Sequence, residues 1–295
     1  MLLSSSVSQI LKYADLKTAV DVFAQTGYDA GDFSTHLRDE FYTDYHNKEY
    51  YTEIKKYAED KGIIFNQAHA PFASSTEDRE ETTRIFQNIV TSMKNASYLG
   101  VKDIVVHPCQ HLEYNDGNNA EILFEINMDF YRRLIPYCEE YGIKVALENM
   151  WQCIPGTTKI THSTCSTPAE FLRYLDELNN DCFIACLDIG HAELVCQDLT
   201  KFIKALGGKY LKALHVHDVD GSRDSHTCPY FGVTDWDKVM KALAEINYTG
   251  DFTYEAGNFM NKKPIELIPA GYEYLAKTGR YLISKFEEYR KEQTK

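Results

Sequence analysis

Residues 183–191, Phe-Ile-Ala-Cys-Leu-Asp-Ile-Gly-His, form a short apolar run that ends in an aspartate and a histidine. Such a run is typical of a β-strand. Runs of this kind recur eight times along the chain, with amphipathic stretches between them, which is the pattern of repeated βα units. The expected strands are residues 2–7, 28–34, 63–70, 103–108, 144–150, 183–190, 211–218 and 251–256.

The stretches between these runs have the pattern of surface helices. Ile85, Ile89 and Met93 recur at helical spacing, so they mark a core-facing stripe. A glycine precedes most strands, as expected where a helix ends in a left-handed residue and turns directly into a strand: Gly27, Gly62, Gly100, Gly142 and Gly250. Eight βα units predict an α/β fold, a (β/α)8 TIM barrel. No linker or composition break divides the chain, so we expect residues 1–295 to form a single domain.

The composition excludes several classes of function. The formal net charge of −13 argues against nucleic acid as a partner, because proteins that track a phosphate backbone present a basic surface. No run approaches the roughly 18 apolar residues of a membrane span, and the start lacks the pattern of a signal peptide. We therefore expect a cytoplasmic protein whose eight cysteines are reduced thiols. No phosphate-cradling glycine loop or dinucleotide fingerprint occurs, so no nucleotide cofactor is expected.

The loops that follow three of the strands are long and polar. They span residues 109–120, 151–166 and 219–234. The loops from helix to strand are short by comparison. In βα barrels the strand-to-helix loops build the face that carries the active site, so this asymmetry predicts a functional C-terminal face.

Histidines and carboxylates stand at the ends of six consecutive expected strands. Each of them taken alone is more often a core hydrogen-bonding residue or a helix cap than a ligand. Together they point to one volume at the barrel mouth, where several carboxylates would repel one another unless a cation neutralised them. These residues are His69, His107, Glu148, Asp188, His191, His215, His217 and Glu255.

The pattern predicts a divalent-metal site. Alternation along a strand puts His215 and His217 on the same side, and His217 is nearer the C-terminal rim, so we favour His217 as the ligand. With Glu148, Asp188 and Glu255 it gives an oxygen-rich set, which suits Mn²⁺, Mg²⁺ or Co²⁺ and is compatible with Zn²⁺.

The series formed by Glu148, Asp188-x-x-His191, His217, Arg223 and Glu255 resembles that of ketose 3-epimerases and related sugar isomerases of the xylose-isomerase-like superfamily. The resemblance spans the whole barrel. It implies that Glu148, Asp188, His217 and Glu255 hold one metal ion, and that His191 and Arg223 contact substrate oxygens. Arg223 could instead pair with Asp220 or Asp224. The chain departs from the family pattern at Tyr230, where a glycine is usual.

The resemblance implies a small sugar as substrate and proton transfer next to its carbonyl. Glu148 and Glu255 would act as base and acid. Trp151 could provide an apolar wall, while His69 and His107 would hydrogen-bond substrate hydroxyls or hold a further ion. Whether the reaction is isomerisation or epimerisation stays open, as does association into a homo-oligomer.

The same chain also resembles the endonuclease-IV-type apurinic endonucleases, which hold three zinc ions and cleave a phosphodiester. It offers a candidate for each of their nine ligands, although the acidic charge counts against this alternative. The candidates are His69, His107, Glu148, Asp188, His191, His217, Asp224, His226 and Glu255.

Overall fold

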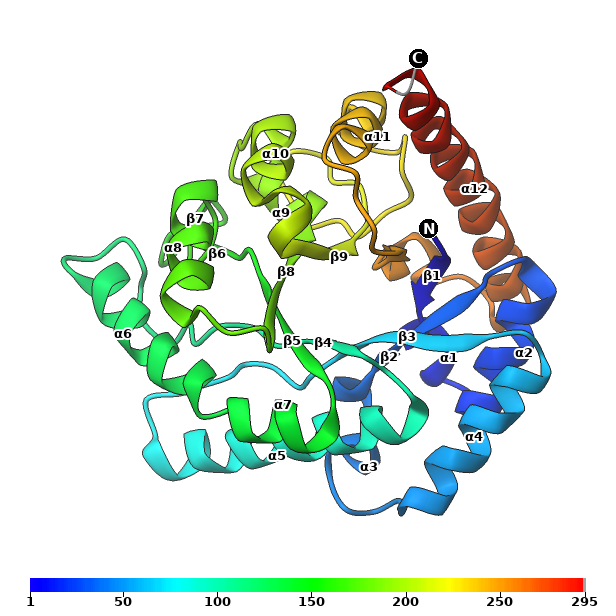
Figure 1. Cartoon of the computed structure of the whole chain (residues 1–295), viewed down its shortest axis with the longest axis horizontal. Helices are drawn as coiled ribbons and strands as arrows, with labels where there is room; N and C mark the ends of the chain where they lie inside the picture. Colours follow the sequence, from blue (N-terminus) through cyan, green and yellow to red (C-terminus); the bar gives the residue numbers. More distant parts are fainter. Residues whose placement is uncertain (294–295) are drawn as a thin grey trace.

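Eight parallel strands form one sheet in the computed structural model, which describes residues 1–293 (Figure 1). Their spatial order is β10-β1-β2-β3-β4-β5-β8-β9. The two ends of this sheet approach each other through a parallel bridge between Val216 and Tyr254, so the sheet curls into a nearly closed TIM barrel. The strands are β1 (Leu3–Ser6), β2 (Ala30–Ser34), β3 (Ile64–His69), β4 (Asp103–Val105), β5 (Lys144–Glu148), β8 (Phe183–Asp188), β9 (Leu211–His215) and β10 (Phe252–Tyr254).

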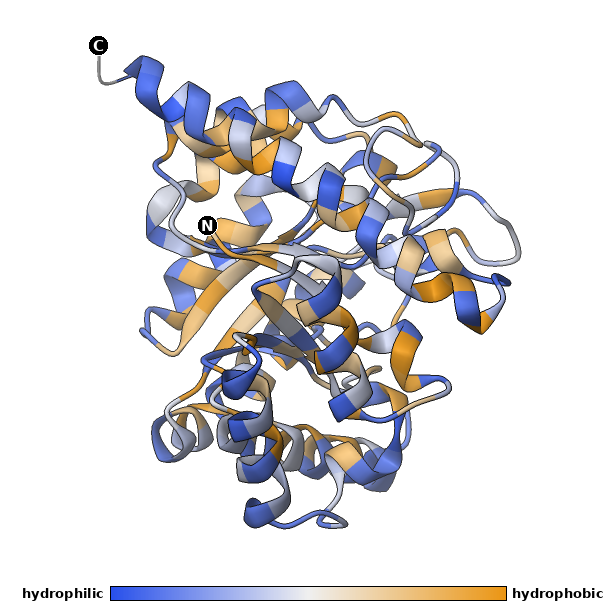
Figure 2. Ribbon diagram, turned by 90° about the vertical axis from the view of Figure 1, so that its right-hand side faces the viewer, coloured by the Kyte–Doolittle hydropathy of each residue, from blue (hydrophilic) through white to orange (hydrophobic). Residues whose placement is uncertain are grey.

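Helices surround the barrel, and Figure 2 shows them striped with hydrophobic and hydrophilic residues. Within residues 1–293, no helix combines the length and apolarity needed to cross a bilayer. The helices are α1 (Ser8–Leu11), α2 (Leu16–Thr26), α3 (Asp39–Tyr42), α4 (Lys48–Asp60), α5 (Arg79–Leu99), α6 (Asn119–Arg132), α7 (Ile135–Tyr141), α8 (Pro168–Leu178), α9 (Ile189–Leu194), α10 (Leu199–Tyr210), α11 (Trp236–Glu245) and α12 (Ile268–Gln293), with the 3₁₀ turns η1 (Thr35–Leu37), η2 (Gly257–Met260) and η3 (Ile265–Leu267).

All eight strands expected from the sequence are present. β2 ends where its expected run ends, and each of the others ends one to three residues earlier. The prediction that a left-handed glycine ends the preceding helix is confirmed at Gly27, Gly62, Gly100 and Gly142, whose φ angles lie between 61° and 92°. Gly250 is an exception. The left-handed residue after α11 is Asn247, whereas a Cβ on Gly250 would lie 2.0 Å from the carbonyl oxygen of Lys212. Close backbone approach therefore requires that glycine.

Two of the long loops have internal structure that positions the barrel mouth. Within residues 151–166, β6 (Trp151–Cys153) and β7 (Ile160–His162) form an antiparallel hairpin. The loop 219–234 is held by the buried carboxylate of Asp218, which accepts hydrogen bonds from the backbone N–H of Val219, Tyr230 and Thr234 and from the indole N–H of Trp236. Tyr230 takes φ 73°, the conformation that glycine favours.

Candidate metal centre

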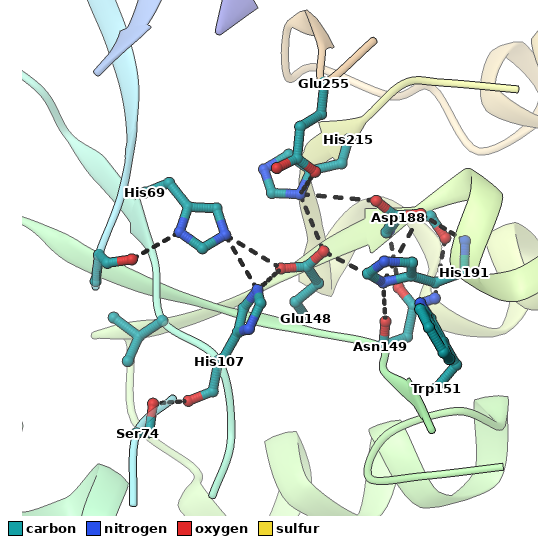
Figure 3. Close-up of polar contacts among 12 residues, drawn as sticks. His69, Ser74, His107, Glu148, Asn149, Trp151, Asp188, His191, His215 and Glu255 are labelled. Carbon is teal, nitrogen blue, oxygen red and sulfur yellow. Dashed lines mark hydrogen bonds and ion pairs between the residues drawn. The ribbon is translucent and has the colours of Figure 1, made fainter. Parts of the chain in front are cut away.

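Four of the predicted ligand residues are the last residues of their strands, so the barrel geometry brings them to one level. His69 ends β3, Glu148 ends β5, Asp188 ends β8 and His215 ends β9. Figure 3 shows Glu148 near the middle of the group, with His69 and His107 on its left, His215 and Glu255 above it and Asp188 and His191 on its right. The donor atoms fall into four overlapping sets. Three of them we name by one histidine each, and the fourth, which consists of His69, His215 and Glu255, joins the first two.

The His69 set consists of His69, His107 and Glu148. The Nε2 atoms of the two histidines lie 3.1 Å apart. Glu148 Oε2 is 3.0 Å from His107 Nε2 and 3.8 Å from His69 Nε2. Two imidazole nitrogens and a carboxylate oxygen therefore converge on one point.

The His215 set consists of Glu148, Asp188, His215 and Glu255. His215 Nδ1 lies 3.0 Å from Glu148 Oε1, 3.2 Å from Glu255 Oε2 and 3.8 Å from Asp188 Oδ2. Three carboxylates thus surround one imidazole nitrogen. Glu148 belongs to both sets through its two oxygens, so it joins them.

The sequence predicted His217 as the imidazole that completes the set with Glu148, Asp188 and Glu255, and that assignment stays a prediction, whereas in this set the imidazole among the carboxylates is that of His215. Strand β9 ends at His215, and His215 is the register partner of Asp188 on β8. His217 lies two residues beyond the strand end, above the level where the carboxylates meet. It contacts only Asp188 among them, with its Nε2 3.0 Å from Oδ2.

The His191 set consists of His191, His217, Asp224 and His226. Asp224 Oδ2 is 2.9 Å from His226 Nε2 and 3.4 Å from His191 Nε2, and Asp224 Oδ1 is 3.9 Å from His217 Nε2. The rings of His217 and His226 stack with centroids 4.0 Å apart. Three imidazoles therefore surround one carboxylate, which the loop 219–234 supplies.

Backbone carbonyls fix the orientation of three of these imidazoles. The Nδ1 atom lies 2.8 Å from Ala70 O in His69, 2.9 Å from Asn149 O in His191 and 2.7 Å from Glu255 O in His226. Because a carbonyl can only accept, each Nδ1 carries the proton, and Nε2 is the atom that faces the carboxylates. This is the usual second-sphere arrangement of metal-binding histidines.

The donor atoms fit divalent cations. Glu148 Oε2 and Asp224 Oδ1 are buried and accept no hydrogen bond, although imidazole nitrogens lie nearby. Buried polar atoms without partners are costly, and a cation would satisfy them. The oxygen-rich His215 set suits Mn²⁺, Mg²⁺ or Co²⁺, whereas the imidazole-rich His69 and His191 sets suit Zn²⁺.

The pKa shifts of the site residues also indicate that positive charge is favoured beside the carboxylates. Burial would raise the pKa of Glu148, but His215 and His107 lower it well below the usual value. Burial would lower the pKa of His226, but its hydrogen bond to Asp224 raises it to about 9. Glu148 is therefore ionised, and the Asp224 carboxylate favours the protonated form of the His226 imidazole. A bound cation would replace that proton.

A cavity of about 370 Å³ opens onto these sets. Its apolar wall includes Phe72, Met150 and Trp151, and the Trp151 indole N–H lies 3.3 Å from Asp224 Oδ2. Among the described residues that line it, none is a lysine or an arginine. The full lining is His69, Phe72, His107, Gln110, Glu148, Met150, Trp151, His191, Asp224, His226 and Glu255.

The structure does not bring Arg223 to this cavity. Its guanidinium pairs with Asp220, with Nε 2.9 Å from Oδ2, and its side chain is 81% exposed. This is the surface pairing that the sequence left open, and a substrate contact by Arg223 stays a prediction without geometric support.

Several residues near the sets were missed from the sequence. Asn149 clamps Asp188 by accepting from its N–H and donating to its carbonyl oxygen. Asp32, buried below the mouth on β2, accepts from Gln67 Nε2 at 3.0 Å. Both follow or interrupt apolar strand residues, which is the same signal that identified Glu148, but neither carries a neighbouring histidine that would have marked it.

Gly190 provides a test of the His191 set. A Cβ at this position would lie 2.0 Å from His217 Cε1 and 2.5 Å from its Nδ1, so Gly190→Ala must displace that ring. We expect the variant to bind metal about 10- to 100-fold more weakly at this set, the usual cost of disturbing the support of a ligand. Metal analysis after competition with a chelator measures the effect. Unchanged metal retention, with normal thermal unfolding, would contradict it.

Comparisons with known families agree with this architecture. Residues 20–278 match the family model described as xylose isomerase-like TIM barrel. An uncharacterised protein of Methanocaldococcus jannaschii is 26% identical over 82% of this chain and 80% of its own length. An uncharacterised protein of Sinorhizobium fredii is also 26% identical, over 64% of this chain, but the match spans only 60% of that relative.

Relatives with named activities come from both classes considered from the sequence. D-psicose 3-epimerase of Enterocloster bolteae is 22% identical over 81% of this chain and 75% of its own. A probable endonuclease 4 of Metamycoplasma arthritidis is 24% identical over 62% of this chain and 63% of its own.

Solved structures share the fold. A D-tagatose 3-epimerase-like protein superimposes with a TM-score of 0.76 at 20% identity, covering 100% of both chains. The IolI protein with a bound zinc atom has a TM-score of 0.75 at 20% identity, covering 98% of this chain and 99% of its own.

Proposed function

The chain belongs to the xylose isomerase-like TIM barrel family, and we propose that it is a divalent-metal-dependent enzyme that isomerises or epimerises a small sugar. The observation that carries this proposal is the placement of Glu148 and Glu255. Both carboxylates line the same cavity and both approach one atom, His215 Nδ1, from different strands. Two carboxylates that reach one site are what proton transfer next to a carbonyl requires.

The metal would be held by the His215 set, namely Glu148, Asp188, His215 and Glu255. A divalent cation there would supply Lewis-acid stabilisation of the negative charge that develops on the substrate oxygens. Asp188 is suited to this place, because one of its oxygens caps α9 by accepting from His191 N–H and its other oxygen faces the site.

The carboxylates would move the proton. One of Glu148 and Glu255 would remove the proton from the carbon next to the carbonyl; the C–H electron pair would form a C=C bond while the carbonyl π pair moves to oxygen, which gives an enediolate. Return of a proton to the opposite face by the other carboxylate gives the epimer. Return to the neighbouring carbon gives aldose–ketose isomerisation.

The cavity wall would position the sugar. Trp151, Met150 and Phe72 form an apolar surface against which the carbon chain can rest. His69, His107 and His191 line the same cavity and can hydrogen-bond hydroxyl groups where they do not bind a second ion. The similarity to D-psicose 3-epimerase of Enterocloster bolteae supports a sugar as substrate.

A second candidate function is trinuclear phosphodiester cleavage. The observation that favours it is that the donors form several overlapping sets, of which His69, Glu148, His215 and Glu255 each belong to two. The cavity speaks against a nucleic-acid substrate, because among the described residues its lining offers no lysine or arginine to a phosphate backbone. The net charge of −13 also argues against a nucleic-acid substrate. We therefore rank this function second.

Metal analysis of the purified protein, followed by two assays, tests the proposal. We expect deuterium from heavy water to be incorporated at the carbon next to the carbonyl of a ketose. This incorporation should depend on Mn²⁺, Co²⁺, Mg²⁺ or Zn²⁺ and should be abolished by a chelator. Three Zn²⁺ per chain together with cleavage of abasic-site DNA, and no exchange into any ketose, would replace the proposal by the second candidate.

A further inference from the structure

A second cavity, of about 210 Å³, adjoins the metal centre. It shares two lining residues, His226 and Glu255, with the cavity described above, so the two spaces meet at these side chains. The rest of its lining comes from three other loops at the C-terminal face, after β1, β2 and β10. These residues are Ser8, Gln9, Lys12, His36, Leu37, Gly257 and Asn258.

Lys12 is the only lysine or arginine among the described residues that line either cavity. Its Nζ lies 3.0 Å from Gln9 Oε1 and 3.4 Å from Asn261 Oδ1. Both partners are neutral amides, and within residues 1–293 no carboxylate forms an ion pair with Lys12. By contrast Lys17, five residues further on, pairs with Glu53 at 2.6 Å.

The amide partners orient the Lys12 ammonium group without neutralising it. An ammonium has three donors, and two are used here, so one remains for a ligand. Partial burial lowers the pKa of Lys12, which is the direction expected for a cation that lacks a counter-charge. An anion bound beside Nζ would supply that charge.

Other polar groups of the cavity are available to the same ligand. His36 Nδ1 is buried and has no hydrogen-bond partner. A Cβ on Gly257 would lie 2.9 Å from Gln9 Nε2 and 3.3 Å from Ser8 Oγ, so the missing side chain leaves room beside both groups. The cavity thus combines an exposed lysine that has no carboxylate partner with neutral donors, and its only carboxylate, that of Glu255, stands at the border with the first cavity.

We propose that this second cavity binds an anionic group, a phosphate or a carboxylate, at the end of the sugar remote from the carbon that exchanges its proton. The inference rests on the proposed function and narrows its substrate class to sugar phosphates or sugar acids. The reacting end of the sugar would lie in the first cavity, whose described lining residues include no lysine or arginine, and the carbon chain of the sugar would pass His226 and Glu255 to reach Lys12.

Equilibrium binding to the metal-loaded protein tests the inference. The probes are D-fructose 6-phosphate, D-fructuronate and D-fructose, measured by calorimetry with the wild type, Lys12→Met, Lys12→Arg and, as a matched control, Lys17→Met. We expect one of the two anionic probes to bind about 10- to 100-fold more tightly than D-fructose, the range for a hydrogen bond to a charged group. Lys12→Met should abolish this preference, while Lys12→Arg and Lys17→Met should retain it.

The outcomes separate the two proposals. If both anionic probes bind no more tightly than D-fructose, or if Lys12→Met keeps the preference, the anion site is overturned, whatever the protein does in the exchange assay. Which anionic probe is preferred decides between phosphate and carboxylate. A preference that depends on Lys12 in a protein without exchange activity would uphold the anion site and remove the proposed isomerase reaction.

Discussion

Glutamine in place of Glu148 is expected to lower turnover by about 10³-fold or more, the upper range for loss of a general acid or base. Glu148 contributes one oxygen to each of two donor sets, so a neutral amide weakens both at once. The side chain is 1% exposed, and glutamine keeps its volume, so the barrel should stay folded.

Steady-state kinetics and metal analysis measure this effect. The matched control is Glu170→Gln, because Glu170 is also a largely buried carboxyl, with a pKa that burial raises to about 7, but it lies on α8 and does not line the cavity. We expect the control to keep both turnover and metal. Substantial activity in Glu148→Gln would rule out the two-carboxylate mechanism.

The sequence predicted the barrel because its signal is local and repeated. Each apolar run such as residues 183–190 needs only its own residues to indicate a strand, and the helices between them show their stripe independently. Eight repetitions then leave little freedom in the architecture. The ends of the strands were less predictable, because residues that continue an apolar run can leave the sheet and still stay buried, as Ile189 does at the start of α9.

The sequence placed the candidate ligands at the barrel mouth more successfully than it placed them relative to one another. A histidine or carboxylate at a strand end must lie near the barrel mouth, so the sequence could nominate Glu148, Asp188 and Glu255. The choice between His215 and His217 depended on where β9 stops and on its register with β8, which are properties of a pair of strands. One sequence does not contain that information.

The loops were the least predictable part of the centre. Asp224 and Arg223 are neighbours in sequence, yet Asp224 faces three imidazoles while the Arg223 guanidinium turns outward to Asp220. The difference comes from Asp218, whose carboxylate gathers the N–H groups of the loop and so fixes its path. Hydrogen bonds between a side chain and distant backbone N–H groups produce no periodic pattern in the sequence, so the path of this loop could not be predicted from it.

Glutamine in place of Glu255 is expected to separate proton exchange on one face of the substrate from formation of the product epimer. The side chain of Glu255 is 24% exposed, against 1% for Glu148, so Glu255 is the carboxylate with access to solvent protons. We expect product formation to fall by about 10²- to 10⁴-fold.

The isotope pattern should be more informative than the rate. With Glu255 disabled, Glu148 can still remove and return a proton on the one face that it reaches, so deuterium from heavy water should enter one of the two epimers and not the other. Nuclear magnetic resonance of the recovered sugars measures this directly. Equal exchange into both epimers would mean that a single group serves both faces, with Glu255 reduced to a metal ligand.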